Sequence, residues 1–294
     1  VDRTGADEFG FSRQEADELA SPLPLLHPKN LYFKMQKALM KLTSRWSKGL
    51  KIGEETGYDS GSTLDYVYQN EPQGSNAFGK WVDKNYLNSI GWRGIRQRKE
   101  NIKIALQQAI SLLKEQQKPV HLLDIASGHG RYILDALSDH HQPDSIRLRD
   151  YSSINVAAGN KLIEERGLSA IATFVEKNAF AAESYQNLEV KPTLGVVSGL
   201  LELFPNNELI SIALKGFGDV IESGGYLIYT NQPYHPQLEM IARCLSSHRD
   251  GEAWVMRRRS QQEMDQLVAR AGFEKVCQWI DGDGIFSVSL AVKK

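Results

Sequence analysis

From residue 120 onward the chain alternates between short apolar runs and amphipathic stretches of helical period. The apolar runs predict five strands, at residues 120–126, 145–150, 171–178, 194–200 and 224–231. Helices are expected between them, at residues 131–140, 154–167 and 207–223. Two last apolar runs, 273–281 and 284–293, meet at a Gly-Asp-Gly turn and predict an antiparallel hairpin. Repeated strand–helix units build a mostly parallel sheet with helices on both faces, so an α/β fold of seven strands is predicted.

The segment before Pro119 lacks this alternation. Residues 1–30 contain three prolines and no helical or strand period, so a linker or flexible arm is expected there. Helical spacing of apolar residues then begins, at Leu31, Met35, Leu39, Leu42, Trp46 and Leu50. Lysines and arginines occupy the other side of this helix. Either the helix packs on its own domain, or it makes a peripheral contact with an anionic membrane or a partner.

Residues 51–98 are rich in glycine, asparagine and aromatic side chains, and a basic run follows them. Such a segment either lines a ligand site or covers a core. A helix is expected at residues 100–117, ended by Pro119. The predicted organisation is an arm (1–30), a helical cap or substrate region (31–98) and a ligand-binding domain (99–294).

Composition excludes several classes of protein. The 294 residues carry 35 Lys+Arg and 36 Asp+Glu, a net charge of -1, so nothing favours general binding to nucleic acid. No uncharged apolar stretch approaches the ~20 residues of a membrane-spanning helix. Cys244 and Cys277 are far apart, which excludes a disulfide framework and favours a reducing, cytoplasmic setting. No metal site is expected, because His140–His141 has no third ligand at useful spacing, and the start at Val1 suggests an excised fragment.

Asp124–Gly130 is a glycine turn between the first strand and its helix. Ligands bind at the carboxyl ends of parallel strands, and Gly128 and Gly130 would let the backbone touch a ligand there. A dinucleotide needs G-x-G-x-x-G, but the third glycine position is Ile133. The Asp124 carboxylate would repel a pyrophosphate, whereas it suits a ligand with an ammonium and a sulfonium group, as in S-adenosylmethionine.

These residues resemble the first motif of class I S-adenosylmethionine-dependent methyltransferases, acid-x-Gly-x-Gly-x-Gly, with Ala126 in place of the first glycine. By that resemblance Asp150 would bond both ribose hydroxyls, and Tyr151 would pack on the adenine. Asn178 stands where the family usually has an aspartate that contacts the adenine amino group. The resemblance implies a Rossmann-like fold and these cofactor-binding residues: Asp124, Ala126, Ser127, Gly128, Gly130, Asp150, Tyr151, Asn178, Ala179, Ser198 and Gly199.

Residues 61–102 are similar to a narrower bacterial family of methyltransferase domains that is often fused behind an α/β-hydrolase-fold domain. That fusion implies a lipid, ester or acyl-derived substrate. It also implies a hydrolase domain outside this chain as a partner, because no G-x-S-x-G nucleophile elbow occurs in these residues.

The resemblance also indicates candidate catalytic and substrate residues. Glu202 and His235 follow the fourth and fifth strands and are candidate bases, where the acceptor carries a proton that it must lose. Candidates for binding substrate or the methionine carboxylate lie in the cap region: Tyr66, Tyr68, Tyr86, Arg93 and Arg96.

Two motifs near the C-terminus have simpler interpretations. Asn231-Gln-Pro-Tyr234 is similar to a motif of DNA-base methyltransferases, but it follows the fifth strand rather than the fourth and is expected to be a turn. Arg257-Arg258-Arg259 is either a solvated segment or an anion site.

The sequence therefore predicts methyl transfer from S-adenosylmethionine to a small-molecule or lipid-like acceptor, leaving S-adenosylhomocysteine. Two rivals remain. A non-catalytic interaction or regulatory module would keep the same fold, and Ala126 and Asn178 are the departures that allow it. A nicotinamide-dependent oxidoreductase is disfavoured by Asp124 and Ile133.

Overall fold

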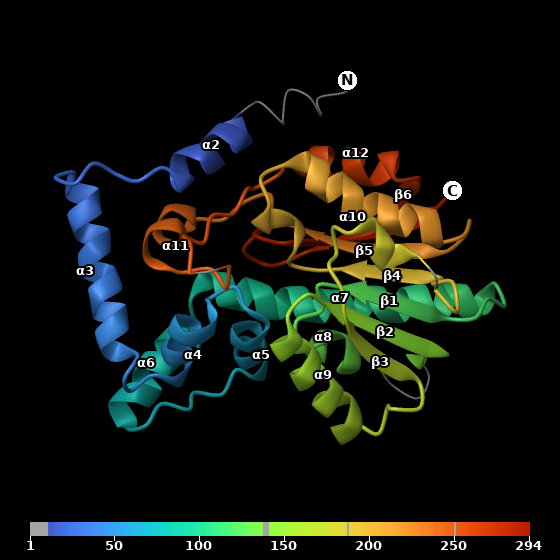
Figure 1. Ribbon diagram of the computed structural model, residues 1–294, viewed down its shortest axis with the longest axis horizontal. Coiled ribbons are helices and arrows are strands. Elements are labelled where there is room, and N and C mark those ends of the chain that lie inside the picture. Colours follow the sequence, from blue (N-terminus) through green and yellow to red (C-terminus); the bar gives the residue numbers. More distant parts are fainter. Residues whose placement is uncertain (1–10, 138–140, 187, 250) are drawn as a thin grey trace.

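A seven-stranded sheet forms the centre of the computed structural model, which describes residues 11–137, 141–186, 188–249 and 251–294 (Figure 1). The strand order is β3-β2-β1-β4-β5-β7-β6; the first five strands along the chain run parallel, and β7 is antiparallel to β5 and β6. The predicted Rossmann-like fold with an antiparallel C-terminal hairpin is confirmed. The strands are β1 (His121–Ile125), β2 (Ser145–Asp150), β3 (Ala172–Glu176), β4 (Leu194–Val197), β5 (Tyr226–Asn231), β6 (Phe273–Ile280) and β7 (Ser287–Lys293).

Helices cover both faces of the sheet. Successive strand residues point to opposite faces, so Leu122 of β1 joins one core and Leu123 the other. In Figure 1, α8 and α9 lie below the sheet and α10 and α12 above it. The helices of the two layers are α7 (Ile90–Glu115), α8 (Arg131–Leu134) and α9 (Ser153–Glu165) on one side, and α10 (Asn207–Val220) and α12 (Gln261–Arg270) on the other.

Two predicted helix boundaries are wrong. α7 begins at Ile90 rather than near Glu100, because Trp92 and Ile95 extend its buried stripe toward the N-terminus. It is thus continuous across the predicted domain boundary at residue 98, and the basic run lies on a helix. α8 ends at Leu134, so the helix predicted at 131–140 is too long; residues 138–140 of that prediction lie outside the described residues.

A second group of helices lies beyond one end of the sheet, at the left of Figure 1. These helices share an aromatic-rich core that includes Phe33, Tyr58 and Trp254. We call this group the cap. Its helices are α2 (Phe11–Ala20), α3 (Pro28–Thr43), α4 (Lys48–Thr56), α5 (Gly61–Gln69), α6 (Ala77–Leu87) and α11 (Leu238–Cys244).

The absence of regular structure predicted for residues 1–30 is wrong for α2. Ala16 and Leu19 are buried, and the Arg243 guanidinium of α11 donates a hydrogen bond to the Glu18 carbonyl over 3.0 Å. The sequence does not reveal this helix, because its apolar face is short and is completed by α11, a segment distant in the sequence.

α3 does not pack on its own domain through the apolar stripe that contains Leu31, Met35 and Leu39, which was the first of the two predicted alternatives. Phe33 is buried and Met40 packs against the cap core, whereas Leu31, Met35 and Leu39 are 72%, 65% and 59% exposed. The stripe predicted to pack inward therefore faces outward, flanked by Lys34 and other exposed lysines of the helix. The predicted single helix also ends at Thr43, and α4 begins anew at Lys48 with Ser47 as its N-cap.

Candidate functional site

The glycine turn joins β1 to α8 at the carboxyl edge of the sheet. Ala126, Gly128 and Gly130 have φ values of 53°, 57° and 74°, in the left-handed region that favours glycine. A Cβ atom on Gly128 would lie 3.3 Å from Gly61 Cα, and one on Gly130 would lie 2.5 Å from a Leu148 methyl group. The positive φ values thus favour glycine at both positions, and α5 and a Leu148 methyl group leave little room for a larger residue there.

Asp150 ends β2 beside this turn and is 4% exposed. Its Oδ2 accepts a hydrogen bond from the Gly128 amide over 2.9 Å. Its Oδ1 accepts from the Ser152 amide over 2.9 Å and from Asn155 Nδ2 over 3.0 Å. Three donors from two elements thus fix the carboxylate between the turn and the start of α9.

A cavity of about 540 Å³ lies over these groups and reaches the cap. Asp150 is part of its wall, so it does not point into bulk water. Of the predicted cofactor-binding residues, those that line this cavity are Ala126, Ser127, Gly128, Gly130, Asp150, Tyr151, Asn178, Ala179, Ser198 and Gly199.

Asp124 is the predicted residue that does not line the cavity. It is fully buried, and both of its carboxylate oxygens lie 2.6 Å from the Tyr132 hydroxyl, which donates to them. Burial raises the pKa of Asp124 to about 8 despite these hydrogen bonds. The predicted direct contact between Asp124 and a ligand ammonium is therefore not found: the residue anchors the turn from behind.

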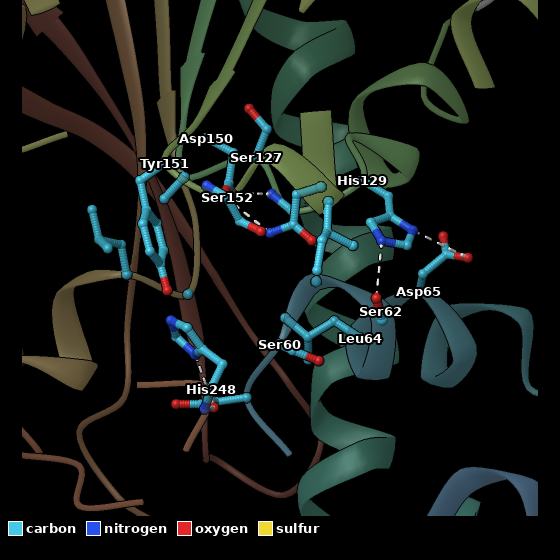
Figure 2. Close-up of a pocket in the computed structure, with 18 of the residues that line it drawn as sticks. Ser60, Ser62, Leu64, Asp65, Ser127, His129, Asp150, Tyr151, Ser152 and His248 are labelled. Atoms are coloured by element: carbon cyan, nitrogen blue, oxygen red, sulfur yellow. Dashed lines mark hydrogen bonds and ion pairs between the residues drawn. The ribbon is translucent and has the colours of Figure 1, made fainter. Parts of the chain in front are cut away.

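The opposite wall of the cavity comes from the start of α5, which sequence analysis did not assign to the cofactor site. Figure 2 shows His129 of the turn beside Ser62 and Asp65 of that helix. His129 Nε2 is 3.3 Å from Ser62 Oγ, and its Nδ1 is 3.7 Å from Asp65 Oδ2. Asp65 also forms an ion pair with Arg131, the first residue of α8. Burial raises the pKa of Asp65, but hydrogen bonds from His129 and Arg131 outweigh it and hold that pKa well below its usual range.

A further pair of rings closes the side of the cavity next to Asp150. Tyr151 lies against His248, with ring centroids 5.7 Å apart (Figure 2). His248 Nδ1 is 2.9 Å from Asp59 Oδ1 in the loop before α5. The aromatic ring of Tyr151 thus lies beside the Asp150 carboxylate at the end of β2. This pairing of groups suits a nucleoside, with the nucleobase on the ring and the ribose on the carboxylate.

Comparison with known proteins identifies the family. The family model described as "Putative methyltransferase" matches residues 1–293. The chain belongs to this family. Its curated relative, the uncharacterized protein YnbC of Escherichia coli K12, is 55% identical over 273 residues, which are 93% of this chain and 46% of the relative. The chain thus spans about half the length of that relative.

Solved structures share the fold of this family member at low identity. A possible exported protein from Bordetella parapertussis matches with a TM-score of 0.67 and 15% identity, over 99% of this chain and 96% of that one. Magnesium protoporphyrin IX methyltransferase from Synechocystis PCC 6803, solved with S-adenosylhomocysteine, matches with a TM-score of 0.54 and 12% identity, over 81% and 97%. The S-adenosylmethionine-dependent methyltransferase SibL matches with a TM-score of 0.53 and 13% identity, over 83% and 72%.

The predicted substrate and carboxylate residues are dispersed in this methyltransferase-family fold. Tyr68 lines the 540 Å³ cavity, but Tyr66 donates to the buried Asp83 over 2.7 Å and does not line it. Arg93 lies on the surface of α7, 3.4 Å from Asp283. Arg96 donates to the Leu87 carbonyl over 2.8 Å. Neither arginine reaches the cavity, because residues of the basic run point to different sides of one helix.

The two candidate bases lie away from the glycine turn, where a second and smaller cavity adjoins the first. Glu202 forms a buried ion pair with Arg98 over 3.1 Å. His235 Nδ1 accepts a hydrogen bond from the Gln237 amide over 3.1 Å, so the proton of the neutral ring is assigned to Nε2. His235 Nδ1 therefore has no free lone pair, whereas Glu202 Oε2 is buried without a hydrogen-bond partner beside the ion pair. Tyr86 lines this second cavity with them.

The arginine run is neither solvated nor an anion site. Arg257 and Arg259 are buried, and Glu263 Oε1 accepts a hydrogen bond from Arg257 Nη2 over 2.7 Å. Arg259 donates to the Leu201 and Phe204 carbonyls over 2.7 and 2.6 Å. Among the described residues, no cluster of metal-ligating side chains is found, and no helix is long and apolar enough to cross a membrane.

Proposed function

We propose that the protein transfers a methyl group from S-adenosylmethionine to a small-molecule or lipid-like acceptor. The observation that supports this most is the Asp150 carboxylate, fixed at the wall of a 540 Å³ cavity beside two glycines of positive φ. A nucleoside fits this combination, because a carboxylate can accept from both ribose hydroxyls while glycine backbone allows close approach.

Each part of the cofactor would meet a suitable group. Asp150 would hold the ribose hydroxyls, and Tyr151 and Asn178 would border the adenine. The Asn178 side-chain oxygen already accepts from the Phe180 amide over 2.9 Å, so a second lone pair or its amide N–H would serve the base. Asp65 and Arg131 form an ion pair at the cavity wall, and this pair would lie beside the ammonium and carboxylate of the methionine end. They replace Arg93 and Arg96 in this role.

The chain's contribution to catalysis would be orientation and exclusion of water. The bound cofactor supplies a methyl group on a sulfonium, and the carbon–sulfur electron pair stays on sulfur when S-adenosylhomocysteine leaves. Because that group is already activated, the cap and the glycine turn need only hold the acceptor in line and keep water out. With its Nδ1 occupied, His235 would donate a hydrogen bond rather than take a proton, which leaves Glu202 as the candidate base for an acceptor that must lose one.

Calorimetric titration with S-adenosylhomocysteine tests the proposal. We expect Asp150→Ala to weaken binding at least ten-fold, since it removes charge-assisted bonds worth roughly 1.5–3 kcal/mol each. Gly128→Val should abolish binding with little change in helix content, because its side chain would meet Gly61. Asp219→Ala, at an exposed ion pair on α10, is the control and should bind as the wild type does. Equal affinity of Asp150→Ala and wild type would refute the assignment.

A non-catalytic module is the second candidate, because Ala126 and Asn178 depart from the motif of the enzymes. Formation of S-adenosylhomocysteine with any acceptor would exclude it. A thermal-shift comparison of NADH with S-adenosylhomocysteine tests the alternative of a nicotinamide-dependent oxidoreductase. We expect S-adenosylhomocysteine to stabilise the protein and NADH to leave its melting temperature unchanged.

We propose three features of its setting. A hydrolase-fold partner is supported by the likeness of residues 61–102 and by the greater length of the E. coli relative. A cytoplasmic location is supported by the two unpaired cysteines. A peripheral contact with a membrane is supported by the exposed apolar stripe of α3.

A further inference from the structure

The second cavity adjoins the cofactor cavity and has a volume of about 150 Å³. Asp59, Leu64, Gly199 and Leu203 line both cavities. A molecule in the second cavity would therefore border a cofactor in the first, across side chains of the cap and of the loop after β4.

The wall of the second cavity is mainly apolar and aromatic. Trp92 and Trp254 stack with ring centroids 6.0 Å apart, and Phe286, Met240 and Met256 continue the surface. An apolar cavity of about 150 Å³ is large enough for a benzene-sized molecule. Its size and lining thus suit a single ring or a short acyl group.

Hydrogen-bond donors interrupt this apolar wall. Within the described part of the chain, Trp254 Nε1, Gln232 Nε2 and Tyr86 Oη are buried without a hydrogen-bond partner. Trp254 is 6% exposed and Gln232 is 1% exposed, so bulk water does not satisfy them freely. A buried donor without a partner costs roughly 1–3 kcal/mol, which a ligand acceptor atom would recover.

His235 adds a fourth donor. Because its Nδ1 accepts from the Gln237 amide, Nε2 carries the proton of the neutral ring. A Cβ atom on Gly91 of α7 would lie 2.9 Å from this Nε2, so the glycine keeps the space in front of it open. Burial lowers the pKa of His235 to about 4, which keeps the ring neutral near pH 7.

The charged side chains of the wall lie in ion pairs, and within the described residues Arg98 Nε and Glu202 Oε2 have no hydrogen-bond partner besides. Arg98 lies 3.1 Å from Glu202, and Asp59 lies 2.9 Å from His248. The cavity therefore offers uncharged donors without a free cation. Such a lining suits a neutral oxygen acceptor better than a carboxylate or phosphate, whose burial without a counter-charge is costly.

We propose that this cavity binds the methyl acceptor through an apolar group of single-ring size whose carbonyl-type oxygen accepts hydrogen bonds from Trp254, Gln232 and His235. The inference rests on the proposed function, because adjacency to the cofactor cavity is what makes the bound molecule the acceptor. Glu202 and Arg98 form an ion pair in the wall, and His235 acts as a hydrogen-bond donor.

Calorimetry with two single-ring probes of similar size tests this, with S-adenosylhomocysteine present. Acetophenone carries a carbonyl oxygen, and ethylbenzene does not. We expect acetophenone to bind more tightly, and we expect Trp254→Phe or Gln232→Leu to lower its association constant about ten-fold, the effect of one hydrogen bond. Gln232→Leu should leave ethylbenzene binding unchanged. Trp81→Phe, at a 61% exposed ring of α6, is the matched control.

The outcomes separate this inference from the proposed function. If S-adenosylhomocysteine binds but both probes bind equally, or Trp254→Phe changes nothing, the acceptor assignment is wrong and the cofactor site stands. If S-adenosylhomocysteine itself does not bind, the proposed function is wrong and the acceptor assignment falls with it. Unaltered S-adenosylhomocysteine affinity in Trp254→Phe and Gln232→Leu shows that those variants are folded.

Discussion

Two aspartates end adjacent strands of the sheet and have opposite environments. Three N–H donors surround Asp150 at the cavity wall, whereas the Tyr132 hydroxyl is shared by both oxygens of the fully buried Asp124. Sequence spacing identifies both as acids at strand ends. It does not show which one meets a ligand, because that depends on how the turn closes and on the position of Tyr132.

The burial of Asp124 predicts a pH-dependent stability. Its pKa of about 8 in the folded protein is above the ~3.9 of an unfolded aspartate, so the native state holds the proton more tightly. This contribution to stability is fully present below about pH 4 and is lost as the pH rises to 8. Asp124→Asn cannot ionise and keeps an acceptor for Tyr132. We therefore expect its free energy of unfolding to fall less between pH 5 and pH 8 than that of the wild type.

Urea unfolding at the two pH values measures this difference. Asp219→Asn, at an exposed site on α10, should follow the wild type. Parallel pH dependence in Asp124→Asn and wild type would show that the buried carboxyl does not titrate in this range.

At the scale of elements, the strands were predictable and the helix faces were not. β2 occupies residues 145–150 as predicted, because Ile146 and Leu148 alternate with polar residues over a short segment, which is the period of a strand. α3 carries two apolar stripes, one with Leu31 and Leu39 and one with Phe33 and Met40. Periodicity finds the helix, but the choice of inward stripe depends on α11 and the cap core, which are distant in the sequence.

The outward stripe of α3 predicts binding to an anionic membrane. Exposed leucines beside exposed Lys34, Lys37 and Lys41 suit a helix that lies in the interface of such a membrane. We expect flotation with phosphatidylglycerol vesicles at low salt, weaker flotation at high salt because the charges are screened, and weak flotation with phosphatidylcholine. Leu31→Glu with Leu39→Glu should abolish it.

Ile212→Glu is the control for that experiment, since Ile212 is an exposed apolar residue on α10, away from α3. No vesicle binding by the wild type at low salt would exclude a membrane. The stripe would then belong to a protein partner or a second copy of the chain.

At the scale of the whole molecule, the segment after α11 joins the cap to the sheet domain. Arg257 donates to Ser12 of α2 over 3.2 Å and to Asn207 at the start of α10 over 3.2 Å, and its amide donates to the Glu202 carbonyl over 2.9 Å. Three consecutive arginines look solvated in a sequence. Arg257 and Arg259 are buried here because acceptors from three distant segments converge on them, which no local pattern reveals.

Glu263 is the carboxylate on which this junction depends. It is fully buried, and it accepts from Arg257 and from Asn207 Nδ2 over 2.7 and 2.8 Å. Glu263→Gln would leave the buried Arg257 and Arg259 guanidiniums without their counter-charge, so we expect a loss of about 3–5 kcal/mol in the free energy of unfolding. Urea unfolding measures it, and Glu208→Gln at an exposed position of α10 should change stability by less than about 0.5 kcal/mol. Because the same side chains bind α2, limited proteolysis should cut residues 11–20 faster in Glu263→Gln. A variant as stable and as resistant as the wild type would mean that the cap is held by its apolar core alone.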